Sequence, residues 1–390
     1  MIISEEVLIQ EIRKAKRILL LEPPFPRKYP PLSLAKISTF CKKHNIETVY
    51  SRHMVYEKFD LILMSTLFTY YSDVVKDTIN SRGLYHRNTP IIVGGVFASL
   101  MPKFFDQFKN LNTYVGYSKE LDYNIPDRSI MDQADPPWDS FSWVFTSRGC
   151  PNFCPYCAVW RIEKERWINP KWQDHIFDDK PNILISDNNL SGTTKEHFHT
   201  IIDYANAKGK AIMFEGGVDC KYVDMDFAKK LASAKYVRHG LRMAFDRIDE
   251  DGIFQTAVRN LVKAGVSTES NMEVFLLFNF DDTPRDAYYR GKEAYHLGIH
   301  QVYPMFYRPL NALSKADPFV GKHWTFNLAR AFRMYWLQRR WFKYYSFEQY
   351  LGLQGTREMF NLTDEDMDKW YNPTVPFHEV TERKLIIRKR

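Results

Sequence analysis

Short apolar runs alternate with stretches of helical periodicity along the first 120 residues. The apolar runs predict buried parallel strands, and the periodic stretches predict helices between them. The predicted strands are Ile18–Leu21, Thr48–Tyr50, Leu61–Met64 and Ile91–Val93, and the predicted helices are Leu32–His44 and Val74–Ile79. This alternation favours a doubly wound, Rossmann-like α/β domain over residues 1–120.

A polar segment follows, and then the alternation resumes. Residues 121–140 are rich in Asp and Pro and lack periodicity, so we expect a linker there. Residues 141–312 carry six βα repeats, which predict an open, partial (β/α)6 barrel. Its predicted strands are Trp143–Thr146, Asn182–Ser186, Ala211–Glu215, Leu241–Phe245, Glu273–Phe278 and Gln301–Met305. We expect residues 313–390 to form a helical C-terminal extension, with a helix at Trp324–Tyr344 and a charged tail ending KLIIRKR.

Composition adds limits on location and partners. No apolar run reaches the roughly 18 residues that a membrane span needs. The N-terminus lacks the pattern of a signal peptide, so we expect a cytoplasmic protein with no membrane partner. The net charge of +7 is spread along the chain, except for a basic and aromatic stretch at residues 333–345. That stretch fits either an anionic partner such as nucleic acid or a helix with packed rings and solvated charges.

Cysteine usage points to a metal cluster. Of five cysteines, three lie within eight residues, at Cys150, Cys154 and Cys157. An odd number without a secretory signal argues against a disulfide framework. Three thiolates at this spacing can hold three irons of a [4Fe-4S] cluster and leave the fourth iron open. A structural zinc site commonly uses two separated ligand pairs, and no second pair is near; Cys41 and Cys220 are expected to be small buried side chains.

The segment Thr146–Cys157, TSRGCPNFCPYC, resembles the radical S-adenosylmethionine superfamily, with Tyr156 as the aromatic residue before the last cysteine. It is similar to the form found in members with an N-terminal cobalamin-binding domain. The resemblance implies that the open iron binds the amino and carboxylate groups of S-adenosylmethionine. An electron, supplied by a donor such as flavodoxin or ferredoxin, then yields methionine and a 5′-deoxyadenosyl radical, which takes a hydrogen from a small-molecule, peptide or nucleoside substrate. It also implies an oxygen-sensitive cluster.

The resemblance further implies cofactor contacts at the ends of successive strands. The expected positions are Tyr156, Ser186, Asp187, Asn188, Glu215, Gly216, Asp219, Arg242, Asp246 and Arg247. The sequence departs from the family where the G-G-E triplet is absent after the second strand and where Asp246 replaces a Glu. The turn at Phe280–Pro284 resembles a family motif or is a helix N-cap, and Tyr303 and Tyr307 line a substrate cavity or pack.

The N-terminal domain resembles a cobalamin-binding domain in several places. It opens with PPFP and PPLSLA, and Ser65, Leu67, Gly94 and Gly95 match positions that approach cobalamin. Glycines suit places where backbone meets a ligand closely. The D-x-H-x-x-G motif is missing, and His53 has neither the Asp nor the Gly at the right spacing. Bound cobalamin and a domain kept for shape or substrate binding both stay open.

Three functions follow from these observations. The first is a radical enzyme that carries out cobalamin-dependent methyl transfer. The second is a radical enzyme that rearranges, cyclises or joins its substrate without cobalamin. The third, from a different class, is a non-catalytic, metal-stabilised module that binds nucleic acid through the basic stretch.

Overall fold

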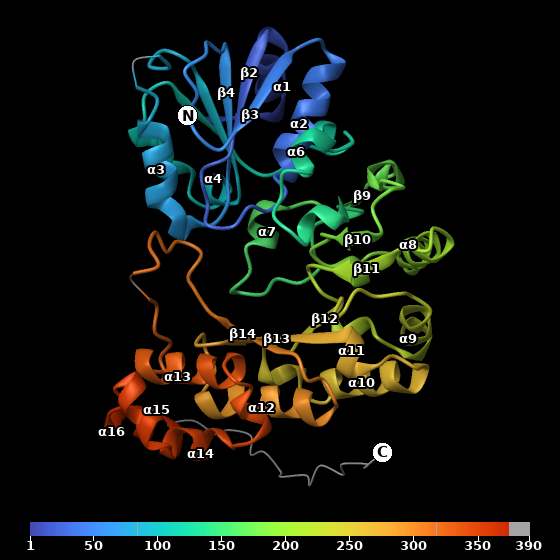
Figure 1. Cartoon of the computed structure of the whole chain (residues 1–390), viewed down its shortest axis with the longest axis vertical. Helices are drawn as coiled ribbons and strands as arrows, with labels where there is room; N and C mark the ends of the chain where they lie inside the picture. Colours follow the sequence, from blue (N-terminus) through green and yellow to red (C-terminus); the bar gives the residue numbers. More distant parts are fainter. Residues whose placement is uncertain (84, 317, 374–390) are drawn as a thin grey trace. The chain divides into compact units, whose positions relative to one another are not determined.

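The computed structural model describes residues 1–83, 85–316 and 318–373. Its internal contacts divide the chain into two units. Unit 1 consists of Met1–Ile183 with Pro309–Asp317, and unit 2 of Leu184–Arg308 with Pro318–Arg390. Each unit combines helices with parallel strands, which confirms an α/β fold (Figure 1).

Unit 1 begins with a long alternation of strands and helices. Its elements are β1 (Ile2–Ile3), α1 (Glu5–Lys14), β2 (Arg17–Leu21), α2 (Leu32–Lys43), β3 (Glu47–Ser51), β4 (Leu61–Thr66), η1 (Thr69–Tyr71), α3 (Ser72–Asn80), β5 (Ile91–Gly95), α4 (Val96–Leu100), η2 (Pro102–Gln107), β6 (Leu111–Tyr114), α5 (Lys119–Asp122), α6 (Arg128–Met131), η3 (Trp138–Ser140), β7 (Phe141–Val144), β8 (Ser147–Arg148), α7 (Val159–Ile162), β9 (Trp167–Ile168) and η4 (Trp172–His175). The strand β10 (Asn182–Ile185) spans the boundary with unit 2.

Six of these strands form one parallel sheet, in the order β1-β6-β5-β4-β2-β3. The four strands predicted before residue 120 are all present, as are the two predicted helices, which are α2 and α3. The sheet gains β1 and β6 at one edge, which the apolar pattern did not predict. The segment expected to be a linker contains the short helices α5 and α6.

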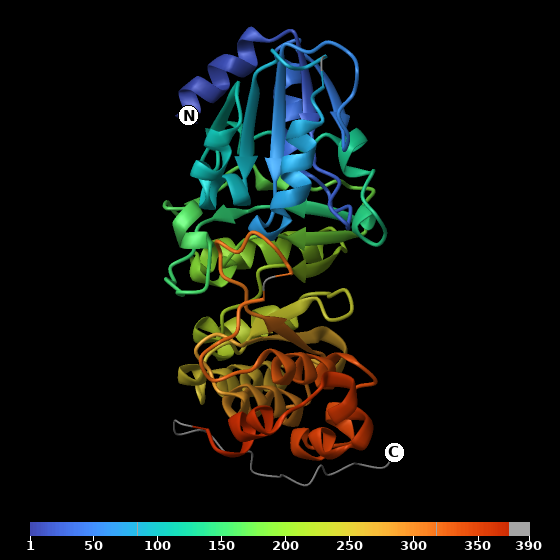
Figure 2. The ribbon, with the colours of Figure 1, turned by 90° about the vertical axis from the view of Figure 1, so that its left-hand side faces the viewer.

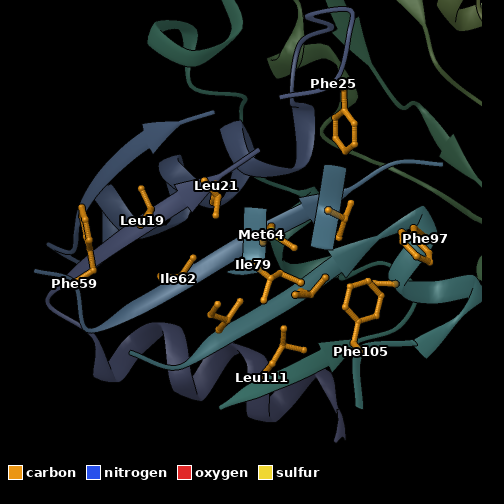
Figure 3. Close-up of a cluster of buried hydrophobic side chains, with 14 residues drawn as sticks. Leu19, Leu21, Phe25, Phe59, Ile62, Met64, Ile79, Phe97, Phe105 and Leu111 are labelled. Atoms are coloured by element: carbon orange, nitrogen blue, oxygen red, sulfur yellow. The ribbon is translucent and has the colours of Figure 1, made fainter. Parts of the chain in front are cut away.

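The central strands β2, β4 and β5 of the unit 1 sheet are buried on both faces. Side chains alternate along each strand, so Leu19 and Leu21 of β2 share a face with Ile62 and Met64 of β4 (Figure 3). This face belongs to the same core cluster as Ile79 of α3. Helix α2 contacts β2, β3 and β4, and Figure 1 shows α1 and α2 on the side away from α3. Burial on both faces explains why the parallel strands read as continuous apolar runs.

Unit 2 contains the remaining elements. They are η5 (Leu190–Gly192), α8 (Lys195–Ala207), β11 (Ala211–Phe214), η6 (Cys220–Tyr222), α9 (Met225–Ala232), β12 (Leu241–Ala244), η7 (Ile248–Glu250), α10 (Ile253–Ala264), α11 (Thr268–Asn271), β13 (Met272–Phe278), α12 (Pro284–His296), β14 (Val302–Phe306), α13 (Phe326–Leu337), η8 (Trp341–Lys343), α14 (Phe347–Gly352), α15 (Gln354–Phe360) and α16 (Asp364–Tyr371).

The strands of unit 2 follow one another in chain order. β12, β13 and β14 pair in parallel, with Val274 of β13 opposite Val302 of β14. The N–H of Glu215 donates to the carbonyl of Ile185 at 2.9 Å, so the ends of β10 and β11 are also neighbours. Strands at all the positions predicted after residue 180 are present.

The helix predicted over Trp324–Tyr344 is wrong in its extent. Helix α13 ends at Leu337, because Arg339 and Arg340 have φ angles of 46° and 51°, and η8 follows. Three rings of this stretch, Tyr335, Trp336 and Phe342, are buried, whereas Tyr344 is 72% exposed and both arginines are exposed. The buried rings fit a packed segment, and the exposed charges are compatible with either interpretation of the basic stretch. The tail KLIIRKR lies outside the described residues.

Residues 309–317 belong to unit 1, although they follow β14 in the sequence. The hydroxyl of Ser72 donates to the carbonyl of Leu313 at 2.7 Å, and Lys315 Nζ donates to the Tyr71 hydroxyl at 2.9 Å. Residues 309–316 are drawn in orange in Figures 1 and 2. Among the described residues, no helix has the length and apolar character to cross a bilayer.

Candidate active site

The three clustered cysteines lie in a loop of unit 1 that is closed at its base. β8 and β9 pair antiparallel, with Ser147 opposite Ile168 and Arg148 opposite Trp167. Residues 149–166 therefore form a loop whose two ends are joined by the paired strands β8 and β9, which we call the clasp. The sequence predicted a strand before the cysteines but not this clasp, because each of its strands has only two residues.

Gly149 fixes the direction in which the loop leaves the clasp. Its φ is +80°, a conformation that suits glycine, and a Cβ there would lie 2.7 Å from the carbonyl oxygen of Glu165. The N–H of Gly149 donates to Glu163 Oε2 at 2.7 Å. The backbone immediately before Cys150 is thus held by a carboxylate from the far side of the same loop.

The cysteines are half-buried and none forms a disulfide. The N–H of Asn152 donates to Cys150 Sγ at 3.4 Å, and the N–H of Val159 donates to Cys157 Sγ at 3.5 Å. Peptide N–H groups aimed at sulfur stabilise thiolates that bind iron. The loop turns at Cys154, whose carbonyl accepts the N–H of Cys157 at 3.0 Å, and Tyr156 is half-buried beside it.

The donor set fits an iron–sulfur cluster in type: three half-buried cysteines in one loop, none in a disulfide and two receiving peptide N–H groups. Within residues 1–83, 85–316 and 318–373, no group of three or more His, Cys, Asp or Glu side chains is arranged to hold a metal ion.

Cys41 and Cys220 are buried, as expected, and burial raises the pKa of each thiol to about 12. Burial likewise lowers the pKa of His175 to about 4.

A buried network of charges adjoins the base of the loop. Arg148 Nε and Nη2 donate to the two oxygens of Asp122 at 2.8 and 3.0 Å, and Nη1 donates to Glu163 Oε1 at 3.0 Å. Lys36 Nζ donates to Asp122 Oδ1 at 2.9 Å. Burial alone would raise the pKa of Asp122, but Arg148 and Lys36 outweigh it and lower the pKa to about 2. Asp122 is therefore ionised near neutral pH.

A cavity of about 360 Å³ opens at the carboxyl end of the parallel sheet in unit 1. This volume is within the range of small-molecule sites. Its wall is mostly apolar and includes the four residues predicted to approach cobalamin together with the four members of the charge network. These residues are Ser65, Leu67, Gly94, Gly95, Lys36, Asp122, Arg148 and Glu163.

Two predicted glycines have structural reasons that need no ligand. Gly95 has a φ of +95°, and a Cβ there would lie 2.2 Å from the carbonyl oxygen of Thr66 on the neighbouring strand. A Cβ on Gly216 would lie 2.2 Å from the carbonyl oxygen of Asp187. Both positions permit two strand ends to approach each other. His53 lines a different cavity, of about 480 Å³, from the one that contains Gly94 and Gly95.

In unit 2 the structure brings several predicted residues together at the ends of β10 and β11. Ser186 Oγ and Glu215 Oε2 are buried, and within the described residues neither has a hydrogen-bond partner. Burial raises the pKa of Glu215, and Arg242 opposes this effect. Asp219 accepts from Asn189 Nδ2 at 3.1 Å and from the N–H of Lys221 at 3.1 Å. Asp187 is buried beside them and Asn188 is half-buried.

The residues predicted at the end of β12 differ in their hydrogen-bond and ion-pair partners. Arg242 Nε donates to Glu273 Oε2 at 2.9 Å, so this guanidinium already has a carboxylate partner. Asp246 Oδ1 accepts the N–H of Leu277 at 2.8 Å. The side chain of Arg247 is 47% exposed and pairs with Asp249. Arg247 therefore lies at the surface of unit 2.

Sequence reasoning missed Glu250, which lies in η7 four residues after Asp246. Its Oε2 accepts the N–H groups of Asp246 at 3.1 Å and Arg247 at 3.3 Å. Burial, and then the charge of Asp246, raise the pKa of Glu250 to about 7. The D-R-I-D-E order was the available signal, because an acidic residue at the third position of a helical turn is typical of a capping box.

The remaining candidates differ in their surroundings: one caps a helix, one packs against a ring, and one is partly exposed. Thr283 caps α12 by accepting the N–H of Asp286 at 3.1 Å, which confirms the N-cap reading of that turn. Tyr307 packs against Phe280, with ring centroids 4.6 Å apart. Tyr303 is 40% exposed and stands on the same face of the β12–β14 sheet as Phe275.

Comparison with known proteins adds nothing to this picture: no protein-family model matches the chain, and no curated protein matches its sequence.

Proposed function

We propose that this chain is a radical S-adenosylmethionine enzyme whose cluster is held by Cys150, Cys154 and Cys157. The observation that carries the proposal is the closed cysteine loop of unit 1, in which peptide N–H groups point at the sulfurs of Cys150 and Cys157. Bound together, the cluster and S-adenosylmethionine supply a one-electron cleavage that produces a 5′-deoxyadenosyl radical. The chain-order strands of unit 2 support a partial barrel in this proposal.

The protein's own residues have distinct tasks in this function. Peptide N–H groups of the loop stabilise the thiolate form of two cysteines. At the strand ends of unit 2, Ser186 Oγ and Glu215 Oε2 are buried oxygens without a hydrogen-bond partner among the described residues, which suits the amino and hydroxyl groups of the cofactor. The aromatic Tyr303 and Phe275, on one face of the β12–β14 sheet, would contact an organic substrate.

The cavity at the sheet of unit 1 favours cobalamin-dependent methyl transfer as the form of the reaction. It collects Ser65, Leu67, Gly94 and Gly95 in one apolar wall. His53 lines another cavity, so the proposal includes no histidine ligand to cobalt from that position. Hydrogen abstraction followed by rearrangement, cyclisation or bond formation is the alternative when this cavity holds no cobalamin.

Anaerobic reconstitution of the full chain with iron and sulfide tests the proposal. We expect cluster absorbance and, with dithionite and S-adenosylmethionine, formation of 5′-deoxyadenosine. Cys154→Ala should abolish both, whereas Cys41→Ala, which removes a buried thiol outside the loop, should retain both. A colourless protein with stoichiometric zinc, or a cluster that persists in Cys154→Ala, would overturn the proposal.

Adding hydroxocobalamin during reconstitution separates the two forms of the reaction. Corrin absorbance that survives desalting, and that falls in Leu67→Glu, would support methyl transfer because Leu67 lies in the apolar wall of the cavity. No retained corrin would favour the alternative without cobalamin.

A further inference from the structure

A continuous network of buried charges connects the 360 Å³ cavity of unit 1 to the first cysteine of the loop. Lys36 lies in the cavity wall and pairs with Asp122, which in turn holds Arg148 through two hydrogen bonds. Glu163 accepts from Arg148 and from the N–H of Gly149. Because Gly149 directly precedes Cys150, the network ends one peptide away from a proposed cluster ligand.

The orientation of this network is fixed on several sides. The guanidinium of Arg148 makes three hydrogen bonds to two carboxylates, and its carbon lies 3.5 Å from the centroid of the Phe145 ring. A planar fork with a ring beneath it has little freedom to rotate. A lysine at this position would keep the charge but lose the fork. The position of Glu163, and through it of Gly149, therefore depends on the shape of Arg148 as well as on its charge.

We propose that Arg148 and Glu163 are positioning residues for Cys150 and that the charges of this network set the reduction potential of the cluster. The inference rests on the proposed function, since it requires a cluster at the loop. Buried charges act through a low effective dielectric and are weakly screened by salt. Reduction adds a negative charge to the cluster, so a nearby carboxylate disfavours it and a nearby cation favours it.

The connection to the cavity makes the same network a route of regulation. Lys36 contributes positive charge to both the cavity wall and the network. A ligand whose anionic group pairs with Lys36 would weaken the hold of Lys36 on Asp122. The cluster would then become harder to reduce when the cavity is occupied by such a ligand.

Two charge-removing variants of opposite sign give the decisive test. The full chain is reconstituted, and the midpoint potential is measured by redox titration followed by electron paramagnetic resonance. Glu163→Gln removes a negative charge and should raise the potential. Lys36→Met removes a positive charge and should lower it. Lys119→Met is the matched control, because the Lys119–Glu165 pair lies at the same loop with side chains 46% and 71% exposed, and the potential should not move.

Arg148→Lys separates positioning from charge. We expect at least a twofold loss of iron per chain, with the potential of the loaded fraction close to that of the unsubstituted protein. Thermal unfolding shows whether this variant folds, and if it does not, the Glu163→Gln and Lys36→Met pair decides alone.

Shifts of opposite sign, with the control unchanged, would support the inference. Shifts in the same direction, or no shift in fully loaded variants, would overturn it while leaving the proposed function intact. An unsubstituted protein that takes up no iron would instead overturn the proposed function, and the inference with it.

Discussion

At the base of the cysteine loop in unit 1, Asp122 accepts hydrogen bonds from both Lys36 and Arg148. At the strand ends of unit 2, by contrast, Ser186 Oγ and Glu215 Oε2 are buried and have no hydrogen-bond partner among the described residues. Folding pairs the charges of the first group with one another and leaves buried oxygens of the second without a partner among the described residues. Buried polar atoms without partners are rare in proteins and need an explanation.

The difference separates two kinds of functional residue. A buried charge that is paired with another side chain contributes to the stability of the fold. Its removal should therefore affect the free energy of unfolding more than it affects ligand affinity. A buried polar atom without a partner lowers the stability of the free protein. A ligand that forms a hydrogen bond with this atom removes the penalty. Removing a paired charge in unit 1 should therefore lower the free energy of unfolding, whereas removing an unpaired polar atom in unit 2 should leave it unchanged or raise it. The predictions below test how buried and exposed polar groups contribute to stability and binding.

The largest effect is expected for Asp122→Ala in unit 1. Removing this carboxylate leaves Arg148 and Lys36 buried with less compensation, which should lower the free energy of unfolding by about 3 to 5 kcal/mol. Urea unfolding with hydrogen exchange at the amides of β2 and β4 would measure it in the correct unit. Asp179→Ala removes a carboxylate from the exposed pair with Arg128 and should leave these amides unaffected. A loss below about 1 kcal/mol would contradict a tightly coupled network.

The next effect concerns pH and Glu250 in unit 2. Its pKa is raised from 4.5 to about 7 in the folded state, so folding favours the protonated form. This contribution to stability is fully present below pH 4.5 and is lost as pH rises through about 7. The total change should be on the order of 3 kcal/mol. Urea midpoints measured from pH 4.5 to 8 should show this decline, and Glu250→Gln should flatten it; an unchanged slope in the variant would refute the assignment.

A smaller effect is expected for Glu215→Gln, and it should appear in binding. Replacing a buried carboxylate whose Oε2 has no hydrogen-bond partner among the described residues should leave the urea midpoint unchanged or slightly higher. Affinity for S-adenosylmethionine should fall about tenfold, equivalent to roughly 1.4 kcal/mol. Calorimetry on the anaerobic, cluster-loaded protein measures the affinity. Glu273→Gln is the matched control, because Glu273 is paired with Arg242 and its loss should lower stability. The same change in the urea midpoint of both variants would contradict the difference between paired and unpaired groups.

The smallest effect is expected for Lys119→Met. Its ion pair with Glu165 at 2.7 Å lies at the surface of the cysteine loop, where solvent screens both charges. We expect no measurable change in the urea midpoint or in iron content. A clear loss of either would show that exposed pairs also hold the loop, and the contrast between buried and exposed charges would need revision.

The sequence predicted the strands well, because burial on both faces produces unmistakable apolar runs such as Leu61–Met64. It missed β6, in which Asn112 and Thr113 interrupt the apolar pattern although Thr113 is buried. The helix predicted at α13 was also too long, because no glycine or proline at residues 338–340 indicates the positive φ angles of Arg339 and Arg340. Local backbone conformation at such positions is decided by packing that local pattern does not contain.

The candidate site was predicted only where its residues are adjacent in sequence. Cys150, Cys154 and Cys157 form a spacing that can be recognised, whereas Lys36 and Asp122 are 86 positions apart. Nothing in the pattern near either residue indicates the other. The segment expected to be a linker in fact supplies Asp122 to the charge network, which only the folded chain reveals.

The return of residues 309–317 to unit 1 affects how the protein is made. A ribosome synthesises these residues after Leu184–Arg308, the first part of unit 2, so the hydrogen bond from Ser72 to Leu313 forms late. An emerging chain can assemble the parallel sheet of unit 1 early, but it lacks this segment until Leu184–Arg308 has been made. Translation that stops before residue 309 would release a chain whose N-terminal unit lacks its last segment.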